Sequence, residues 1–344
     1  MRLITLLFFI MTLELFSQSP KFSFYRTSIK VVTTDVQNVI KVYKGTFKNL
    51  QEINNRKSII GNIKRQGDKL TFSPLLPFQV ETNYTVVYGR KLYEFSIPLE
   101  SNYKILGVKN LYPNYSELPS NLLKWYVEFS KPVNPTNIYD HISLIDNITQ
   151  KKVDRAFLPL ENPLLSNDGK LLTLWIEPGR QKRDLGPNKH LGKVLEIGKS
   201  YTLMIDGNLK DSKGIPMRSN FTFSFEVFEA DRTQPDINNW KLNPPKRNTK
   251  DELVIHLNDK LDYGSLINNL ILYNNKQIEG VFTIDSNNNK VIFTPFHKWK
   301  PNTYVLKCNK LIEDLAGNNL ERLFDRDVQE QKVTPTLERS FTIN

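Results

Sequence analysis

Cysteine is almost absent from this chain of 344 residues, in which Cys308 is the only one. A single cysteine cannot form an intramolecular disulfide, so no internal cross-link contributes to stability. In the segment TYVLKC, the alternation of residue types places Cys308 on the same face as Tyr304 and Leu306. This pattern indicates a buried cysteine on a strand rather than an exposed nucleophile.

Histidine is scarce too, and the motifs of the common enzyme classes are missing. The four histidines, at positions 141, 190, 256 and 297, lack the spacing of a metal site. The sequence has no Gly-x-Ser-x-Gly, no His-Glu-x-x-His, no phosphate-binding glycine loop and no dinucleotide-binding motif. We therefore expect no enzyme activity, no cofactor and no metal. A carboxylate pair for glycoside hydrolysis stays open, because two acids need only be close in space. The nearest candidates, Glu161, Asp168 and Glu177, are more typical of surface charge.

Long apolar runs are missing after the first residues of the chain. Residues 1–17 combine a positive charge at Arg2, an apolar run from Leu3 to about Leu13 and a small residue near the end. This is the layout of a cleaved signal peptide. A membrane-spanning helix needs roughly 20 apolar residues, and Glu14 ends the run earlier. We predict an exported mature chain without a transmembrane span; an uncleaved anchor is the alternative.

Acidic residues are outnumbered, since 47 Lys and Arg stand against 36 Asp and Glu, a formal net charge of +11. A basic chain can bind nucleic acid, a membrane surface or an acidic glycan. The lysines, however, are mostly spread singly among asparagines and acids, as on a solvated surface. Export further disfavours nucleic acid, so we predict no nucleic-acid partner.

What the sequence does contain is an internal repeat. Three passages align, KLTFSPLLPFQVETNYTVVYG from Lys69, LLTLWIEPGRQ…LEIGKSYTLMIDG from Leu171 and KVIFTPFHKWKPNTYVLKCN from Lys290. Each consists of an alternating strand, a proline, a turn and a second strand entered through a tyrosine. These tyrosines are Tyr84, Tyr201 and Tyr304. Alternation with a period of two is typical of half-buried antiparallel strands.

The repeat predicts the domain organisation. About seven short strands in each unit, with turn signals between them and no strongly periodic helix, are typical of a β-sandwich. We predict an all-β chain of three tandem antiparallel β-sandwich domains, residues 18–102, 103–231 and 232–344, after the signal peptide. The connectors between them are polar, carry prolines and lose the alternation.

The second and third units share further motifs. The second contains EFSKPVNP from Glu128 and ISLID from Ile142, and both units contain an Asp-x-x-Gly turn, at Asp211 and Asp314. Neither turn gathers the oxygen ligands of a dedicated calcium site. Together with the Tyr-x-Leu strand, these motifs resemble bacterial Ig-like domains of the S-layer-protein type. The resemblance covers residues 105–344 well and residues 22–98 only in their second half. It implies spacers or binding modules of exported bacterial proteins, without a common catalytic site.

A basic insertion distinguishes the second unit. From proline to tyrosine, the first and third passages span 11 and 10 residues, whereas Pro178 to Tyr201 spans 24. The inserted loop, residues 179–197, holds the candidate ligand-binding residues Arg180, Lys182, Arg183, Lys189 and His190. Arginine side chains in a long loop can receive a carboxylate, a phosphate or an acidic sugar. The equally weighted alternative is a structural arm whose arginines pair with acids such as Asp154 or Glu161.

These observations predict a non-catalytic exported protein that acts as a scaffold, adaptor or spacer. We expect it in the periplasm or at the outer envelope, with another envelope protein or an anionic glycan as its partner. The alternative is a carbohydrate or cell-wall binder that uses the basic loop and exposed aromatics such as Trp240 and Trp299. Trp125 and Trp175 lie on alternating strands and are expected in the core.

Overall fold

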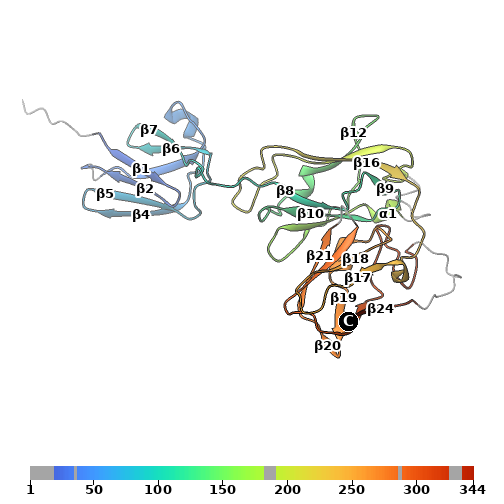
Figure 1. Ribbon diagram of the computed structural model, residues 1–344. Helices are drawn as coiled ribbons and strands as arrows, with labels where there is room; N and C mark the ends of the chain where they lie inside the picture. Colours follow the sequence, from blue (N-terminus) through green and yellow to red (C-terminus); the bar gives the residue numbers. More distant parts are fainter. Residues whose placement is uncertain (1–18, 35–36, 182–190, 286–288, 325–334) are drawn as a thin grey trace, which may run out of the picture. The chain divides into compact units, whose positions relative to one another are not determined.

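The computed structural model describes residues 19–34, 37–181, 191–285, 289–324 and 335–344 (Figure 1). It divides into two compact units, residues 1–104 and residues 105–344. The predicted signal peptide, residues 1–17, lies outside the described residues.

The first unit is a sandwich of two antiparallel sheets (Figure 1). One sheet has the order β1 (Lys21–Tyr25), β2 (Ser28–Val32), β5 (Lys69–Pro74) and β4 (Gly61–Gln66). The other has the order β3 (Ile40–Lys44), β6 (Asn83–Tyr88) and β7 (Lys91–Ser96), and η1 (Leu50–Ile53) follows β3 in the chain. Alternate side chains such as Val31, Phe72 and Val86 are buried between the sheets, as period-two alternation requires.

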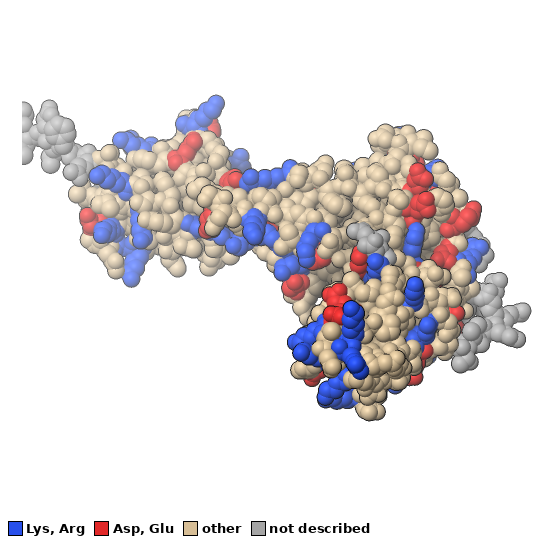
Figure 2. Space-filling model, viewed as in Figure 1, with Lys and Arg blue, Asp and Glu red and all other residues tan. Residues whose placement is uncertain are grey.

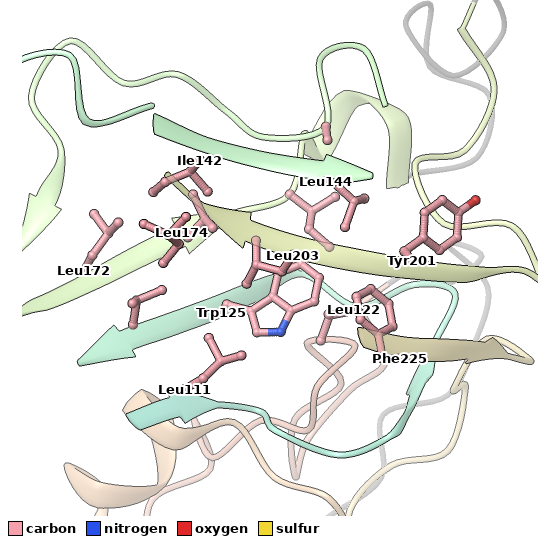
Figure 3. Close-up of a cluster of buried hydrophobic side chains, with 14 of the residues drawn as sticks. Leu111, Leu122, Trp125, Ile142, Leu144, Leu172, Leu174, Tyr201, Leu203 and Phe225 are labelled. Atoms are coloured by element: carbon pink, nitrogen blue, oxygen red, sulfur yellow. The ribbon is translucent and has the colours of Figure 1, made fainter. Parts of the chain in front are cut away.

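The second unit begins with a sandwich whose core surrounds Trp125. One sheet has the order β13 (Leu164–Leu165), β14 (Leu171–Trp175), β10 (Lys124–Phe129) and β8 (Val108–Tyr112). The other has the order β12 (Lys151–Lys152), β11 (Ile142–Asp146), β15 (Ser200–Ile205), β16 (Phe221–Phe228) and β9 (Glu117–Pro119). The short helices are η2 (Ile138–His141) and α1 (Pro178–Gln181). Trp125 is fully buried among Leu122, Leu203 and Phe225 (Figure 3), whereas Trp175 is only half-buried.

A third sandwich completes this unit. One sheet has the order β17 (Lys241–Asn243), β18 (Leu253–His256), β22 (Lys290–Pro295) and β21 (Gly280–Asp285). The other has the order β20 (Lys276–Gln277), β19 (Leu270–Asn274), β23 (Asn302–Cys308) and β24 (Glu338–Ile343). The short helices are η3 (Ile237–Asn239) and α3 (Tyr263–Ile267). Cys308 is buried as predicted, and burial raises the pKa of its thiol to about 12. The predicted all-β class of antiparallel sandwiches is therefore confirmed.

The repeated tyrosine has the same role in all three sandwiches. Its hydroxyl accepts a hydrogen bond from a backbone amide four or five residues upstream, as in the tyrosine corner of Ig-type sandwiches. The donors are Gln79 for Tyr84 at 2.8 Å, Glu196 for Tyr201 at 3.2 Å and Lys300 for Tyr304 at 3.2 Å. The residues just before these donors are Phe78, Leu195 and Trp299, and each is buried. In all three repeats, the tyrosine hydroxyl thus fixes the segment that leads into the tyrosine strand.

A glycine at the start of the outer strand is a second shared feature, and it supports a first prediction. A Cβ atom at Gly280 would lie 2.5 Å from the carbonyl oxygen of Thr294 and closer still to the ring of Phe293. Gly61 packs in the same way against Phe72. We expect Gly280→Ala to lower the free energy of unfolding by about 1–3 kcal/mol, because the ring must move. Urea denaturation measures this change.

The matched control is Gly107→Ala. Nothing lies within 4 Å of the Cβ position at Gly107, and its φ lies outside the left-handed region. This control is expected to change stability by less than about 0.5 kcal/mol. Equal losses in the two variants would contradict the packing explanation.

Candidate functional site

The base of the inserted loop is organised around Arg180. This side chain is 4% exposed, although its residue type is normally solvated. Its guanidinium donates to four backbone carbonyl oxygens, those of Asp154 at 2.5 Å, Gly192 at 2.8 Å, Lys193 at 2.9 Å and Leu191 at 3.0 Å. One acceptor lies upstream of the loop and three lie where the described chain resumes. Arg180 therefore joins the two stems of the loop to the sandwich, and the carbonyl of Asp154 rather than its carboxylate is the acceptor.

The other candidate binding residues, Lys182, Arg183, Lys189 and His190, lie outside the described residues. Their role in binding an anion stays a prediction. The far stem of the loop is also fixed, because Val194 and Leu195 are buried in the core of the second sandwich. For Arg180, the geometry favours the alternative of a structural arm over a ligand-binding role, because its guanidinium N–H groups already donate to backbone carbonyl oxygens.

A second candidate site is the junction between the second and third sandwiches. The Asp-x-x-Gly turn of the third sandwich packs against residues that precede β10. Leu315 is buried in the core cluster of the second sandwich, and its carbonyl oxygen accepts a hydrogen bond from the amide of Leu123 at 3.0 Å. Gly317 has a φ of +81°, and a Cβ atom there would collide with Leu123. This turn thus couples two hydrophobic cores.

A buried ionic cluster lies at the same junction. The Nζ atom of Lys124 lies 3.5 Å from Asp262 Oδ1 and 3.2 Å from Glu313 Oε2. The Tyr126 hydroxyl also donates to Asp262 Oδ1, at 3.0 Å. The side chains of Lys124 and Asp262 are 10% and 4% exposed. Burial raises the pKa of Asp262, and the ammonium of Lys124 opposes this rise. A charge in such a site needs its partner, because water no longer solvates it.

Asp262 also caps helix α3. Its Oδ1 accepts the amide of Ser265 at 2.8 Å, which satisfies a donor that the helix leaves free. The next residue, Tyr263, stacks on Tyr112 of the second sandwich with ring centroids 4.0 Å apart and planes 11° apart. A narrow crevice beside this stack is lined by Pro113, Tyr115, Leu257, Asn289 and neighbouring residues. Side chains of both sandwiches thus form its walls.

The connector between the two sandwiches is held from both sides. The backbone of Asp231 exchanges two hydrogen bonds with the side chain of Asn121, at 2.7 and 2.9 Å. The side-chain amide of Asn318, in the third sandwich, donates to the carbonyl oxygen of Asp231 at 3.1 Å. These contacts fix the start of the connector, whose sequence is expected to be semi-rigid.

The two Asp-x-x-Gly turns show what their aspartates do. Each carboxylate accepts two amides of its own turn, those of Lys213 and Ile215 for Asp211, and those of Ala316 and Asn318 for Asp314. The glycines adopt left-handed φ values of +84° and +81°. Within the described residues, no group of three or more His, Cys, Asp or Glu side chains could hold a metal ion.

Asp314 leads to a prediction about pH. Burial raises its pKa to about 7, and the charge of Asp231 adds to this rise. The ordinary pKa of 3.8 applies in the unfolded chain, so the folded state binds the proton more tightly. Stability is therefore gained as pH falls from about 7 towards 3.8, by up to about 1.4 kcal/mol per pH unit for one group.

Thermal unfolding at mildly alkaline and mildly acidic pH measures this effect. The wild-type chain is expected to unfold at a higher temperature in the acidic buffer. Asp314→Asn should reduce the difference, because the amide does not titrate. Buried Asp262 shifts in the same direction, so the comparison with the variant isolates Asp314. A wild-type chain that loses stability on mild acidification would contradict the assignment.

The expected exposed aromatics are buried, and that prediction is wrong. Trp240 is 1% exposed and Trp299 is 2% exposed. Trp299 occupies the core position held by Phe78 and Leu195 in the other repeats, and its indole donates to the carbonyl oxygen of Asp251 at 2.8 Å. Neither ring is available to stack on a sugar.

Glu177, expected on the surface, is likewise buried. It is 9% exposed, and its carboxylate accepts the amide of Gly179 at 3.2 Å. Asp168, in contrast, is an exposed acid that bonds Ser166 in its own turn at 2.6 Å. Glu177 and Asp168 thus each accept a hydrogen bond from a residue two positions away in the sequence.

The antiparallel sandwiches with their tyrosine anchors define an Ig-like protein. Residues 231–334 match the family model of the bacterial Ig-like domain, which agrees with the resemblance of this region. No curated protein matches the chain. Within the described residues, no helix has the length and hydropathy to cross a membrane.

Comparison with solved structures finds matches at low identity. Native alpha-2-macroglobulin from Escherichia coli is 12% identical, with 70% of this chain and 72% of that chain covered and a TM-score of 0.24. SGBP-B of the Bacteroides ovatus mixed-linkage glucan utilization locus is 10% identical, with 92% and 63% covered and a TM-score of 0.20. The Escherichia coli adhesin FdeC is 8% identical, with 93% of each chain covered and a TM-score of 0.20. Similarity at this level carries no information about function.

Proposed function

We propose that this protein is a non-catalytic scaffold, adaptor or spacer of the bacterial cell envelope or surface, built from Ig-like domains of the S-layer-protein type. Its compartment in this proposal is the periplasm or the outer envelope. The junction within residues 105–344 is the observation that supports it. Domains in tandem normally move relative to one another unless their interface is large and well packed. Here an apolar turn, a buried ionic cluster and a doubly held connector join two sandwiches into a stiff arm.

Stiffness can be measured as a distance distribution between spin labels on the two sandwiches. Ile148 is 72% exposed in the second sandwich and Ile271 is 45% exposed in the third, so cysteines at these sites accept labels. Cys308 is replaced by alanine to remove the native thiol. A narrow distribution is expected for the whole chain, and Asp262→Leu should broaden it. A broad distribution without that substitution would contradict the stiff arm.

The partner is sought by cross-linking and pull-down from the native envelope, with the chain from Gln18 onward as bait. A matched variant, Lys182→Ser with Arg183→Ser, removes loop charge and leaves the buried Arg180 in place. Recovery of a specific envelope protein supports the adaptor, and its loss in the variant assigns the contact to the loop. Recovery from the soluble cytoplasmic fraction alone would contradict the proposal.

Binding of an anionic glycan is the second candidate, and it rests on the basic composition of the loop. The buried Trp240 and Trp299 cannot supply its aromatic platform. The same pull-down separates the two candidates, because glycan-degrading enzymes added beforehand should abolish recovery only if a glycan is bound.

A further inference from the structure

The positive charge of the chain is concentrated in the first unit. Residues 18–104 contain 14 Lys and Arg against 6 Asp and Glu, whereas residues 105–344 contain 32 against 29. The first unit thus carries most of the excess charge in about a quarter of the chain. Figure 2 shows Lys and Arg outnumbering Asp and Glu on the visible face of this unit. Charge of one sign at this density creates a field that attracts anionic surfaces.

One end of the same sandwich presents an exposed apolar tip, which consists of Ile60, Leu75, Leu76 and Pro77. The exposed fractions of Ile60, Leu75 and Leu76 are 76%, 75% and 77%, the largest among the exposed large hydrophobic residues of the described chain. Pro77 is exposed as well. A single exposed leucine needs no explanation, but a contiguous apolar group on a soluble domain marks an interaction site.

Backbone hydrogen bonds hold the tip in place. The amide of Leu75 donates to the carbonyl oxygen of Ile60 at 2.9 Å, so the two apolar strand ends lie side by side. The amide of Phe78 donates to the carbonyl oxygen of Arg26 at 2.8 Å. Phe78 is buried in the core, which anchors the loop from below. The apolar side chains are therefore presented by a fixed loop.

Basic residues flank the segments that form the tip. The carbonyl oxygen of Arg26 accepts the amide of Phe78, the residue after Pro77, and Arg56 and Lys57 stand four and three residues before Ile60; all three basic residues are exposed. Lys44 donates to the side chain of Gln79, two residues after Pro77, at 3.0 Å. Glu52, four residues before Arg56, accepts the amide of Lys48 within its own turn.

The third sandwich shows that the fold does not require an apolar residue at each of these positions. Its equivalent backbone bond runs from Phe296 to Glu279 at 3.0 Å. Glu279 therefore occupies the position of Ile60, and His297 that of Leu76, with a distance of 3.2 Å between His297 Nε2 and Glu279 Oε2. The same framework thus carries one exposed apolar residue, Phe296, between Glu279 and His297 in one repeat, and a nearly continuous apolar tip in the other.

We propose that the apolar tip of the first sandwich docks on a bilayer of anionic phospholipid. Leucine, isoleucine and proline side chains enter the boundary between headgroups and acyl chains, while the surrounding Arg and Lys side chains contact the phosphates. Membrane-surface binding combines these two elements, apolar burial and attraction to anionic lipid. A glycan fits less well, because the tip offers no aromatic face for sugar stacking. This inference does not depend on the adaptor proposal.

Vesicle flotation tests the proposal with purified components. The chain from Gln18 onward is used, because the apolar run of residues 3–13 would itself bind lipid. We expect binding to phosphatidylcholine vesicles that contain phosphatidylglycerol, and at least a tenfold weaker binding to phosphatidylcholine alone. Leu75→Ser with Leu76→Ser should weaken binding about tenfold, and Arg26→Ser with Lys57→Ser should do the same and reduce its salt dependence.

The matched control is Phe296→Ser, at the position in the third sandwich that is equivalent to Leu75. It should leave vesicle binding unchanged, and circular dichroism checks that every variant is folded. Equal binding by the Leu75→Ser, Leu76→Ser variant would overturn the proposal, as would equal binding to neutral vesicles. If the chain instead forms dimers that this variant dissolves, without binding vesicles, the tip is a contact between two copies and the lipid proposal is wrong.

Discussion

Replacing Asp262 by leucine is expected to lower the free energy of unfolding of residues 105–344 by about 3–5 kcal/mol, because it leaves a buried lysine without its nearest buried partner. Of its two acidic partners in the cluster, Lys124 would retain Glu313, which is more exposed. The substitution also removes the cap of helix α3 and the acceptor of the Tyr126 hydroxyl. Urea denaturation, monitored by tryptophan fluorescence, measures the loss.

A double-mutant cycle separates the ion pair from these other contacts. Asp262→Asn keeps an acceptor for Ser265 and Tyr126, so it is expected to cost less than leucine. Lys124→Met together with Asp262→Leu removes both charges, and we expect it to be more stable than the sum of the single variants by about 1 kcal/mol or more. Simple additivity would show that the two charges do not interact energetically.

Arg180→Met is expected to have the second large effect, a loss of about 2–5 kcal/mol. Four backbone carbonyl oxygens lose their donor at once, and a buried acceptor without a partner costs about 1–3 kcal/mol. Arg180→Lys should rescue little, because an ammonium cannot reproduce the planar fork of five N–H groups. Thermal unfolding measures the loss of stability. Hydrogen exchange of residues 191–197 measures the loosening of the far stem of the loop.

The control for Arg180 is Arg232→Met, which removes an exposed arginine from the connector. This variant is expected to unfold like the wild-type chain. If Arg180→Met is equally harmless but abolishes recovery of the envelope partner, Arg180 is a ligand residue and the structural explanation of its contacts is wrong.

The sequence predicts the strands and the three-fold repeat well, because alternation and turn residues are local signals. Tyr84, Tyr201 and Tyr304 mark the same backbone anchor in each sandwich, and Cys308 is buried as its strand pattern indicates. The aspartates of the two Asp-x-x-Gly turns bond their own backbone, which the residue types at those positions favour. These features need no knowledge of distant contacts.

The predictions that fail have different causes. The sequence interpretation places Trp299 on the surface, although it stands four residues after Pro295 just as the core residue Phe78 stands four residues after Pro74. The cluster of Lys124, Asp262 and Glu313 could not be predicted, because its members are far apart in the sequence and meet only when two sandwiches pack. Charge counted over the whole chain also concealed the basic character of the first unit.

Leu315 has a consequence for the order in which the chain matures. The second sandwich is synthesised before the turn that carries this leucine, yet its core includes the leucine side chain. A nascent chain that stops near residue 231 therefore has an unfilled position beside Leu123. Without the third sandwich, the core of the second therefore lacks the side chain of Leu315. Removal of the third sandwich would open that core to water beside Leu123.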